Sequence, residues 1–163
     1  MALTLSSPVF QDGLEIPSLY TCDGQDISPG LLWQDVPEGT VSFALICDDP
    51  DVPETLKDQV PTLVWDHWVL FDIPANVRAI PQGGFKGVEK GSHGKNSWGR
   101  NDYGGPCPPN PKPHRYFFKL FALDTMLNLS PSTTKDQLLK AMEGHILGQA
   151  TLMGTYLRGQ FRK

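Results

Sequence analysis

The sequence lacks a long hydrophobic run and an excess of positive charge, and each absence excludes a class of protein. No apolar stretch approaches the roughly 20 residues that span a bilayer. The start, Met1 to Thr4, has neither the charged region nor the apolar segment of a signal peptide. The formal net charge of -4 argues against a broad nucleic-acid surface. We therefore expect a soluble protein with no membrane span and no nucleic-acid partner.

Cysteine is also scarce. The chain has three cysteines, Cys22, Cys47 and Cys107, and no CxxC spacing. An odd number of this kind fits a reducing compartment better than a disulfide framework. We therefore expect a cytoplasmic protein without a disulfide framework.

Glycine and proline are what the chain has in abundance. The 163 residues include 16 glycines and 15 prolines, which interrupt the chain too often for a helical bundle. The hydrophobic fraction of 39% is that of ordinary globular proteins. We expect one domain over residues 1–163, built of short strands joined by long loops.

Four segments have the composition of strands: residues 41–48, 62–73, 115–124 and 145–157. The first is nearly all apolar, as expected of a strand covered on both faces. In the third, every second residue from Tyr116 to Ala122 shares one apolar face. In the fourth, Gly148 and Gly154 fall on one face, where another element can approach closely.

One helix is evident near residue 134. Thr134 and Gln137 match a capping box, and Leu138 and Met142 follow at helical spacing. Gly144 is placed to end the helix in the left-handed conformation. The predicted fold class is therefore mainly β, an antiparallel sandwich or Greek-key sheet with few helices.

Residues 83–113 form a long stretch rich in glycine and proline, and loops of this length are usually functional or disordered. The stretch from Phe85 to Arg115 carries a net charge of +4, so the rest of the chain carries -8. A basic loop on an acidic protein is expected to attract small anions.

Three clusters carry side chains suited to binding. Asp49 begins a DPDVP segment, His67 lies between Trp65 and Trp68, and His114 follows a GGPCPP segment. Each lies at an end of a predicted strand, so all three can meet in one cleft. Charged histidines donate strong hydrogen bonds to oxyanions, and glycine N–H groups can complete such a site. Asp49 would then hold a histidine in its charged form.

The motifs also support a family resemblance. DPDVP at 49–53, DHWVLFDIP at 66–74 and GGPCPP at 104–109, followed by HRYFF at 114–118, resemble the phosphatidylethanolamine-binding protein family in order and spacing. The match is to its bacterial and archaeal branch, the Raf kinase inhibitor-like proteins. It extends from residues 20–29 near the start to Gly144–Leu147 near the end.

The resemblance implies a large antiparallel Greek-key sheet packed with a smaller sheet. It also implies a pocket for phosphate, sulfate, acetate or a phosphoethanolamine head group, without a cofactor or metal. The residues implied are Asp49, His67, Gly105, Pro108, Pro109, His114 and Tyr116. A protein partner such as a kinase or protease, and a homodimer, are further expectations. Cys107 departs from the family pattern, since animal members have glycine there.

Three other readings remain open. Cys107 with His67 or His114 would make a cysteine-dependent hydrolase. Asp49, His67 and His114 would make a zinc site with water as the fourth ligand. A protein-interaction module would use the same pocket to recognise a phosphorylated segment.

Overall fold

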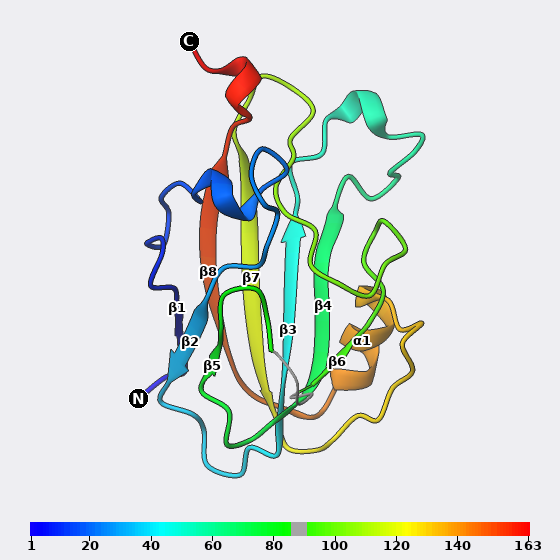
Figure 1. The fold of residues 1–163 in the computed structure, drawn as a ribbon. Helices are drawn as coiled ribbons and strands as arrows, with labels where there is room; N and C mark the ends of the chain where they lie inside the picture. Colours follow the sequence, from blue (N-terminus) through cyan, green and yellow to red (C-terminus); the bar gives the residue numbers. More distant parts are fainter. Residues whose placement is uncertain (86–90) are drawn as a thin grey trace.

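The computed structural model describes residues 1–85 and 91–163. Within them, eight strands form two antiparallel sheets. The larger sheet has the order β6-β4-β3-β7-β8 and the smaller has the order β1-β2-β5 (Figure 1). Strand β7 returns to pair with β3 after β4 and β6 have extended the other side, which is a Greek-key arrangement. The predicted fold class is confirmed.

The bounds follow chain order. The strands are β1 Thr4–Ser6, β2 Leu31–Gln34, β3 Ser42–Asp49, β4 Trp65–Pro74, β5 Ala79–Ile80, β6 Ser92–His93, β7 His114–Leu123 and β8 Ile146–Tyr156. The helices are α1 Lys135–Met142 and the short 3₁₀ turns η1 Ser18–Tyr20, η2 Glu54–Leu56 and η3 Gly159–Phe161.

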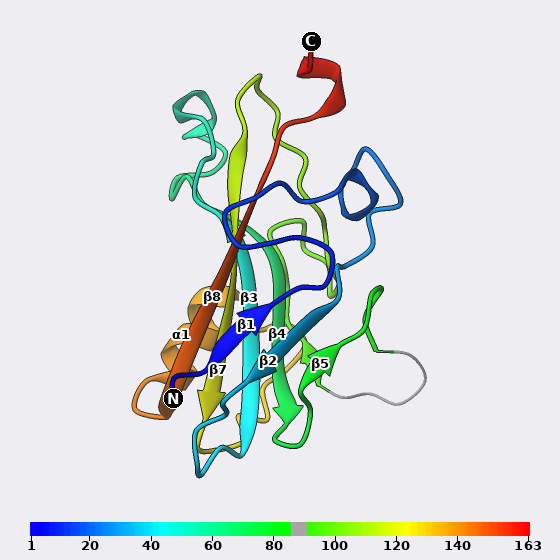
Figure 2. The same ribbon diagram turned by 90° about the vertical axis from the view of Figure 1, so that its left-hand side faces the viewer.

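The large sheet is covered on both faces. Figure 2 shows α1 on one side of it and the small sheet on the other. Along β3, Phe43, Leu45 and Cys47 face the core beneath the small sheet, whereas Ala44 and Ile46 face the core beneath α1. Every residue of β3 is buried, so the apolar run predicted a strand covered on both faces correctly.

The local predictions around α1 and β8 are confirmed. The Thr134 side chain accepts from the Gln137 backbone, and the Gln137 side chain accepts from the Thr134 backbone. Gly144 has a φ of 82° just beyond the helix. A Cβ at Gly148 would lie 2.9 Å from Pro37, and one at Gly154 would lie 2.4 Å from Ile16.

The segment at residues 62–64 was predicted as strand and is instead a turn that leads into β4. Leu63 has a φ of 56°, and the Thr62 hydroxyl accepts from the Val64 backbone N–H. The β-branched composition of 62–64 was therefore overridden by a local hydrogen bond.

The cysteine prediction is wrong. Cys22 and Cys107, 85 residues apart, form a disulfide, and Cys47 is the buried free cysteine. The bridge joins the loop after η1 to the GGPCPP segment, a proximity that sequence spacing does not reveal. The cysteine count therefore no longer supports a reducing compartment. Within the described residues, no helix is long and apolar enough to cross a membrane.

Candidate functional site

The three predicted clusters meet at one end of the large sheet. Asp49 ends β3, while His114 begins β7 and His67 lies near the start of β4. Both β4 and β7 pair with β3 in antiparallel fashion, so their starts lie beside its end. The sheet topology therefore brings together side chains that are up to 65 residues apart in the chain.

A β-bulge gives His67 its position. Cys47 pairs with Trp68, but the next residue, Asp48, pairs with Asp66, so His67 is an extra residue on β4. The bulge lets His67 and Trp68 lie on the same face of the sheet, where His67 contacts Tyr116 and Trp68 packs in the core. Bulges of this kind re-aim side chains next to functional sites.

His114 is held through both ring nitrogens. Its Nδ1 lies 2.7 Å from Oδ2 of Asp49, and its Nε2 lies 2.6 Å from Oδ1 of Asn110. Both oxygens accept, so both nitrogens donate when the ring carries its positive charge. Asp49 is therefore placed to fix the orientation of the His114 ring. A direct bond from His114 to a ligand requires Asn110 to give way.

His67 is held through one nitrogen only. Its Nδ1 lies 2.7 Å from the carbonyl oxygen of Gly104, and the Gly104 N–H donates back to the His67 carbonyl. No described residue forms a hydrogen bond with Nε2 of His67. Burial lowers the pKa of His67, and the Gly104 carbonyl and the nearby Asp49 only partly oppose this effect.

Tyr116 lies between the two imidazoles. The His67 ring meets it edge-on at 5.1 Å between centroids, and the His114 ring stacks at 6.5 Å. The Tyr116 hydroxyl is buried and forms no hydrogen bond of ordinary geometry with a described residue, although it lies close enough to Asp49 for that carboxylate to act on it. Burial, followed by the negative charge of Asp49, raises the pKa of this hydroxyl, so it remains a neutral O–H group.

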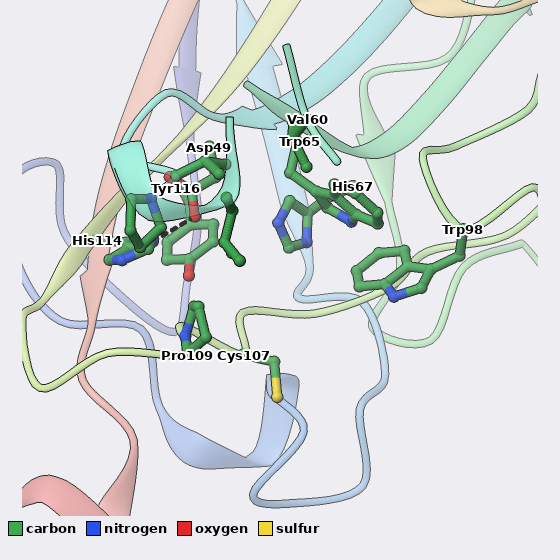
Figure 3. A pocket seen from close by; sticks show the side chains of 12 residues that line it. Asp49, Val60, Trp65, His67, Trp98, Cys107, Pro109, His114 and Tyr116 are labelled. Carbon is green, nitrogen blue, oxygen red and sulfur yellow. Dashed lines mark hydrogen bonds and ion pairs between the residues drawn. The ribbon is translucent and has the colours of Figure 1, made fainter. Parts of the chain in front are cut away.

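These side chains line a cavity of about 260 Å³. Figure 3 shows the His67 and His114 rings on opposite sides of it, with Trp98 next to His67 and Pro109 below Tyr116. The remaining walls are mostly apolar and come from Val52, Pro53, Leu56, Val60, Trp65, Trp98, Cys107 and Pro109. The volume lies below the roughly 300–1,000 Å³ of pockets for drug-sized ligands, so the cavity suits a small group.

Five of the seven residues predicted for the site line this cavity: Asp49, His67, Pro109, His114 and Tyr116. Gly105 and Pro108 do not. The Gly105 N–H donates to Oδ1 of Asp26 and is therefore not available to an anion in this structure. A Cβ at Gly105 would lie 2.3 Å from the Tyr20 carbonyl oxygen, so packing requires this glycine.

The described part of the basic loop places no charged side chain in the cavity wall. Arg115 pairs with Asp51 and Arg100 pairs with Asp102, and none of these four residues lines the cavity. Lys95 is exposed, while Lys86 and Lys90 lie outside the described residues. No lysine or arginine of the described chain lines the cavity. Its ionisable groups are Asp49, the two imidazoles and the Tyr116 hydroxyl.

The structure also bears on the cysteine-dependent hydrolase and on the zinc site considered above. The sulfur of Cys107 is bonded to Cys22, so it offers no thiolate nucleophile. In residues 1–85 and 91–163, no group of three or more His, Cys, Asp or Glu side chains is arranged to hold a metal ion. Asp49 and His114 are instead bonded to each other.

Sequence reasoning missed Asn110, Trp98 and the apolar wall formed by residues 52–60. Trp98 meets the rings of Trp65 and His67 edge-on, at 5.5 and 5.0 Å between centroids. Its position among glycine and polar residues in a loop gave no periodic signal. A tryptophan within a long loop was the available hint, because aromatic side chains in loops often anchor ligands.

Comparison with known proteins places the chain in a family. The family model described as phosphatidylethanolamine-binding protein matches residues 6–157. A UPF0098 protein of Methanothermobacter thermautotrophicus is 48% identical, covering 96% of this chain and 100% of that protein. A UPF0098 protein of Chlamydia pneumoniae is 44% identical, covering 94% and 98%.

Comparison with solved structures indicates the same family as the sequence relatives do. The homolog CT736 from Chlamydia trachomatis has a TM-score of 0.88 at 39% identity, covering 96% of this chain and 98% of that one. E. coli YbcL is described as a new member of the mammalian PEBP (phosphatidylethanolamine-binding protein) family. It has a TM-score of 0.85 at 29% identity, covering 97% of this chain and 99% of that one. The chain belongs to the phosphatidylethanolamine-binding protein family.

Proposed function

We propose that this protein binds a small oxyanion, such as phosphate or a phosphate group of a larger molecule, in the cavity between His67 and His114 and does not transform it chemically. Two observations in the same cavity support this most: one imidazole nitrogen of His67 is unengaged, and the buried Tyr116 hydroxyl has no hydrogen-bond partner of ordinary geometry among the described residues. Buried polar groups without partners are rare in proteins, and a ligand is one reason for them.

The walls favour binding over catalysis. Apolar side chains surround the polar groups, which is the usual design of a ligand pocket. The disulfide at Cys107 leaves no nucleophile of the kind that the hydrolase alternative needs. We therefore propose a binding protein rather than an enzyme.

The same site would recognise a phosphorylated side chain on a protein partner such as a kinase or a protease. A phosphopeptide that competes with inorganic phosphate for the cavity would support this extension. A phosphoethanolamine head group is the matching lipid-derived probe, and competition between the two shows which one the cavity prefers.

The proposal is tested by calorimetric titration of the purified protein with inorganic phosphate. Replacing His67 or His114 by alanine is expected to weaken binding by about 1–3 kcal/mol, because each removal leaves a buried polar site incomplete. His145→Ala is the matched control, since His145 is about half exposed and bonded to Asp124. Absence of phosphate binding by the unaltered protein, or equal binding by all three variants, would refute the proposal.

A further inference from the structure

The environment of His67 fixes which ring nitrogen carries the proton. The Gly104 carbonyl oxygen can only accept, so Nδ1 of His67, 2.7 Å away, must be the N–H nitrogen. In the neutral ring, Nε2 then carries a lone pair and acts as an acceptor. His67 lines the cavity and is 3% exposed, so this acceptor belongs to a nearly dry site.

The ionisable groups around His67 come from three parts of the chain. Asp48 and Asp49 belong to β3, His114 and Tyr116 belong to β7, and Asp26 belongs to the loop before β2. The three carboxylates raise the pKa of His67, but desolvation is larger and lowers it overall. The ring is therefore neutral at neutral pH and does not attract an anion by its charge. No lysine or arginine of the described chain lines the cavity to supply that charge instead.

We propose that the cavity selects oxyanions that still carry a proton, because Nε2 of His67 accepts a hydrogen bond from the ligand. This inference rests on the proposed function and narrows its ligand class. Monohydrogen phosphate offers a P–OH group to Nε2 and bare oxygens to a donor such as the buried Tyr116 hydroxyl. Sulfate has the same shape and the same charge above neutral pH, but it has no proton to donate.

Lone pairs of sulfate would face the lone pair of Nε2, and a site built to bond a polar hydrogen rejects an analogue that lacks it. Phosphodiesters also lack such a proton, so a lipid phosphodiester is expected to bind as weakly as sulfate. A phosphate monoester, whose second pKa is about 6, binds in its singly charged form. Inorganic phosphate is therefore the preferred probe above neutral pH.

The test compares inorganic phosphate with sulfate by calorimetry at about pH 8 and about pH 5. At pH 8, phosphate is expected to bind about tenfold more tightly or better. As the pH is lowered from 8 towards 5, the fraction of charged His67 rings rises, a charged ring donates to either anion, and the ratio is expected to fall. His67→Gln offers an amide N–H at the position of Nε2, so this variant is expected to bind both anions similarly at pH 8.

Histidine ring ¹⁵N spectra of the unaltered protein provide a readout that does not depend on a variant. They are expected to show His67 with its proton on Nδ1 at pH 8. Equal affinity for sulfate and phosphate at pH 8, or a proton on Nε2, would overturn the inference and leave the proposed function standing. Binding of neither anion would overturn the proposed function itself.

Discussion

Nδ1 of His114 and Oδ2 of Asp49 lie 2.7 Å apart, joined across 65 residues of sequence at the shared end of β7 and β3. Both side chains are almost fully buried, at 2% and 6% exposure. A charge-assisted bond in such a place stabilises the fold only while both partners are present. The pair therefore links the structure of the cavity to the stability of the sheet.

Replacing Asp49 by asparagine tests this link. The amide keeps an oxygen near Nδ1 but loses the charge, so we expect the free energy of unfolding to fall by about 1.5–3 kcal/mol near neutral pH. Urea denaturation gives the value. The control is Asp124→Asn, which alters another aspartate–histidine pair whose partner, His145, is 45% exposed. Its effect is expected to stay below about 0.5 kcal/mol, and equal losses in both variants would contradict the prediction.

Stability is also expected to depend on the protonation of His67. Burial lowers the pKa of His67 in the folded protein below the ordinary value of 6.5. Near and below pH 6.5, the unfolded chain therefore binds more protons at this residue than the folded protein does. Stability therefore rises with pH in that range and is lost as the pH falls through it.

The measurement is the free energy of unfolding at about pH 5 and about pH 7.5, in a buffer without phosphate or sulfate. His67→Gln removes this titration, so the unaltered protein is expected to lose more stability on acidification than the variant does. The comparison cancels groups that titrate alike in both proteins. An identical pH slope in the two proteins would show that burial does not shift the protonation of His67.

Local signals in the sequence predicted most of the large sheet. Each of β3, β7 and β8 lies within one residue of its predicted bounds, because each is an apolar or alternating run between turn residues. The capping box at Thr134 is equally local, since both partners lie within one helical turn. The convergence of Asp49, His67 and His114 was also foreseen, because each lies near the end of a recognisable strand.

What the sequence could not provide depends on contacts between distant segments. The bulge at His67 arises from its pairing with β3, which leaves Trp68 and Asp66 opposite adjacent residues. Asn110 bonds to His114 only because the loop before β7 folds back on it. The long loop does contribute Trp98, Cys107 and Pro109 to the cavity wall. The partners of its charged side chains could not be predicted, since Arg100 and Arg115 pair with Asp102 and Asp51.

The disulfide gives a prediction that is independent of any ligand. The protein unfolded without reductant is expected to show one reactive thiol, Cys47, and three after reduction. In the folded protein Cys47 is expected to be unreactive, because burial raises the pKa of its thiol. Thiol titration with Ellman's reagent measures each count. Three thiols in the unfolded, unreduced chain would show that the bridge is absent.

The same bridge should contribute to stability. It closes a loop of 85 residues, and removing a disulfide of this kind typically costs about 2–4 kcal/mol. The double variant Cys22→Ala, Cys107→Ala is expected to show this loss in urea denaturation. Adding reductant should destabilise the unaltered protein and leave the double variant unchanged, which separates loss of the bridge from loss of side-chain packing.

The contact between Gly154 and Ile16 gives the last prediction. A Cβ at Gly154 would lie 2.4 Å from Cγ1 of Ile16, which is fully buried and cannot move aside freely. Gly154→Ala is therefore expected to lower the free energy of unfolding by about 1–3 kcal/mol, the usual cost of overpacking. Gly159→Ala is the matched control, because a Cβ there would lie 3.9 Å from Asp23 and meet no clash. If both substitutions are equally tolerated in thermal and urea denaturation, β8 does not depend on this close approach to hold the N-terminal segment against the sheet.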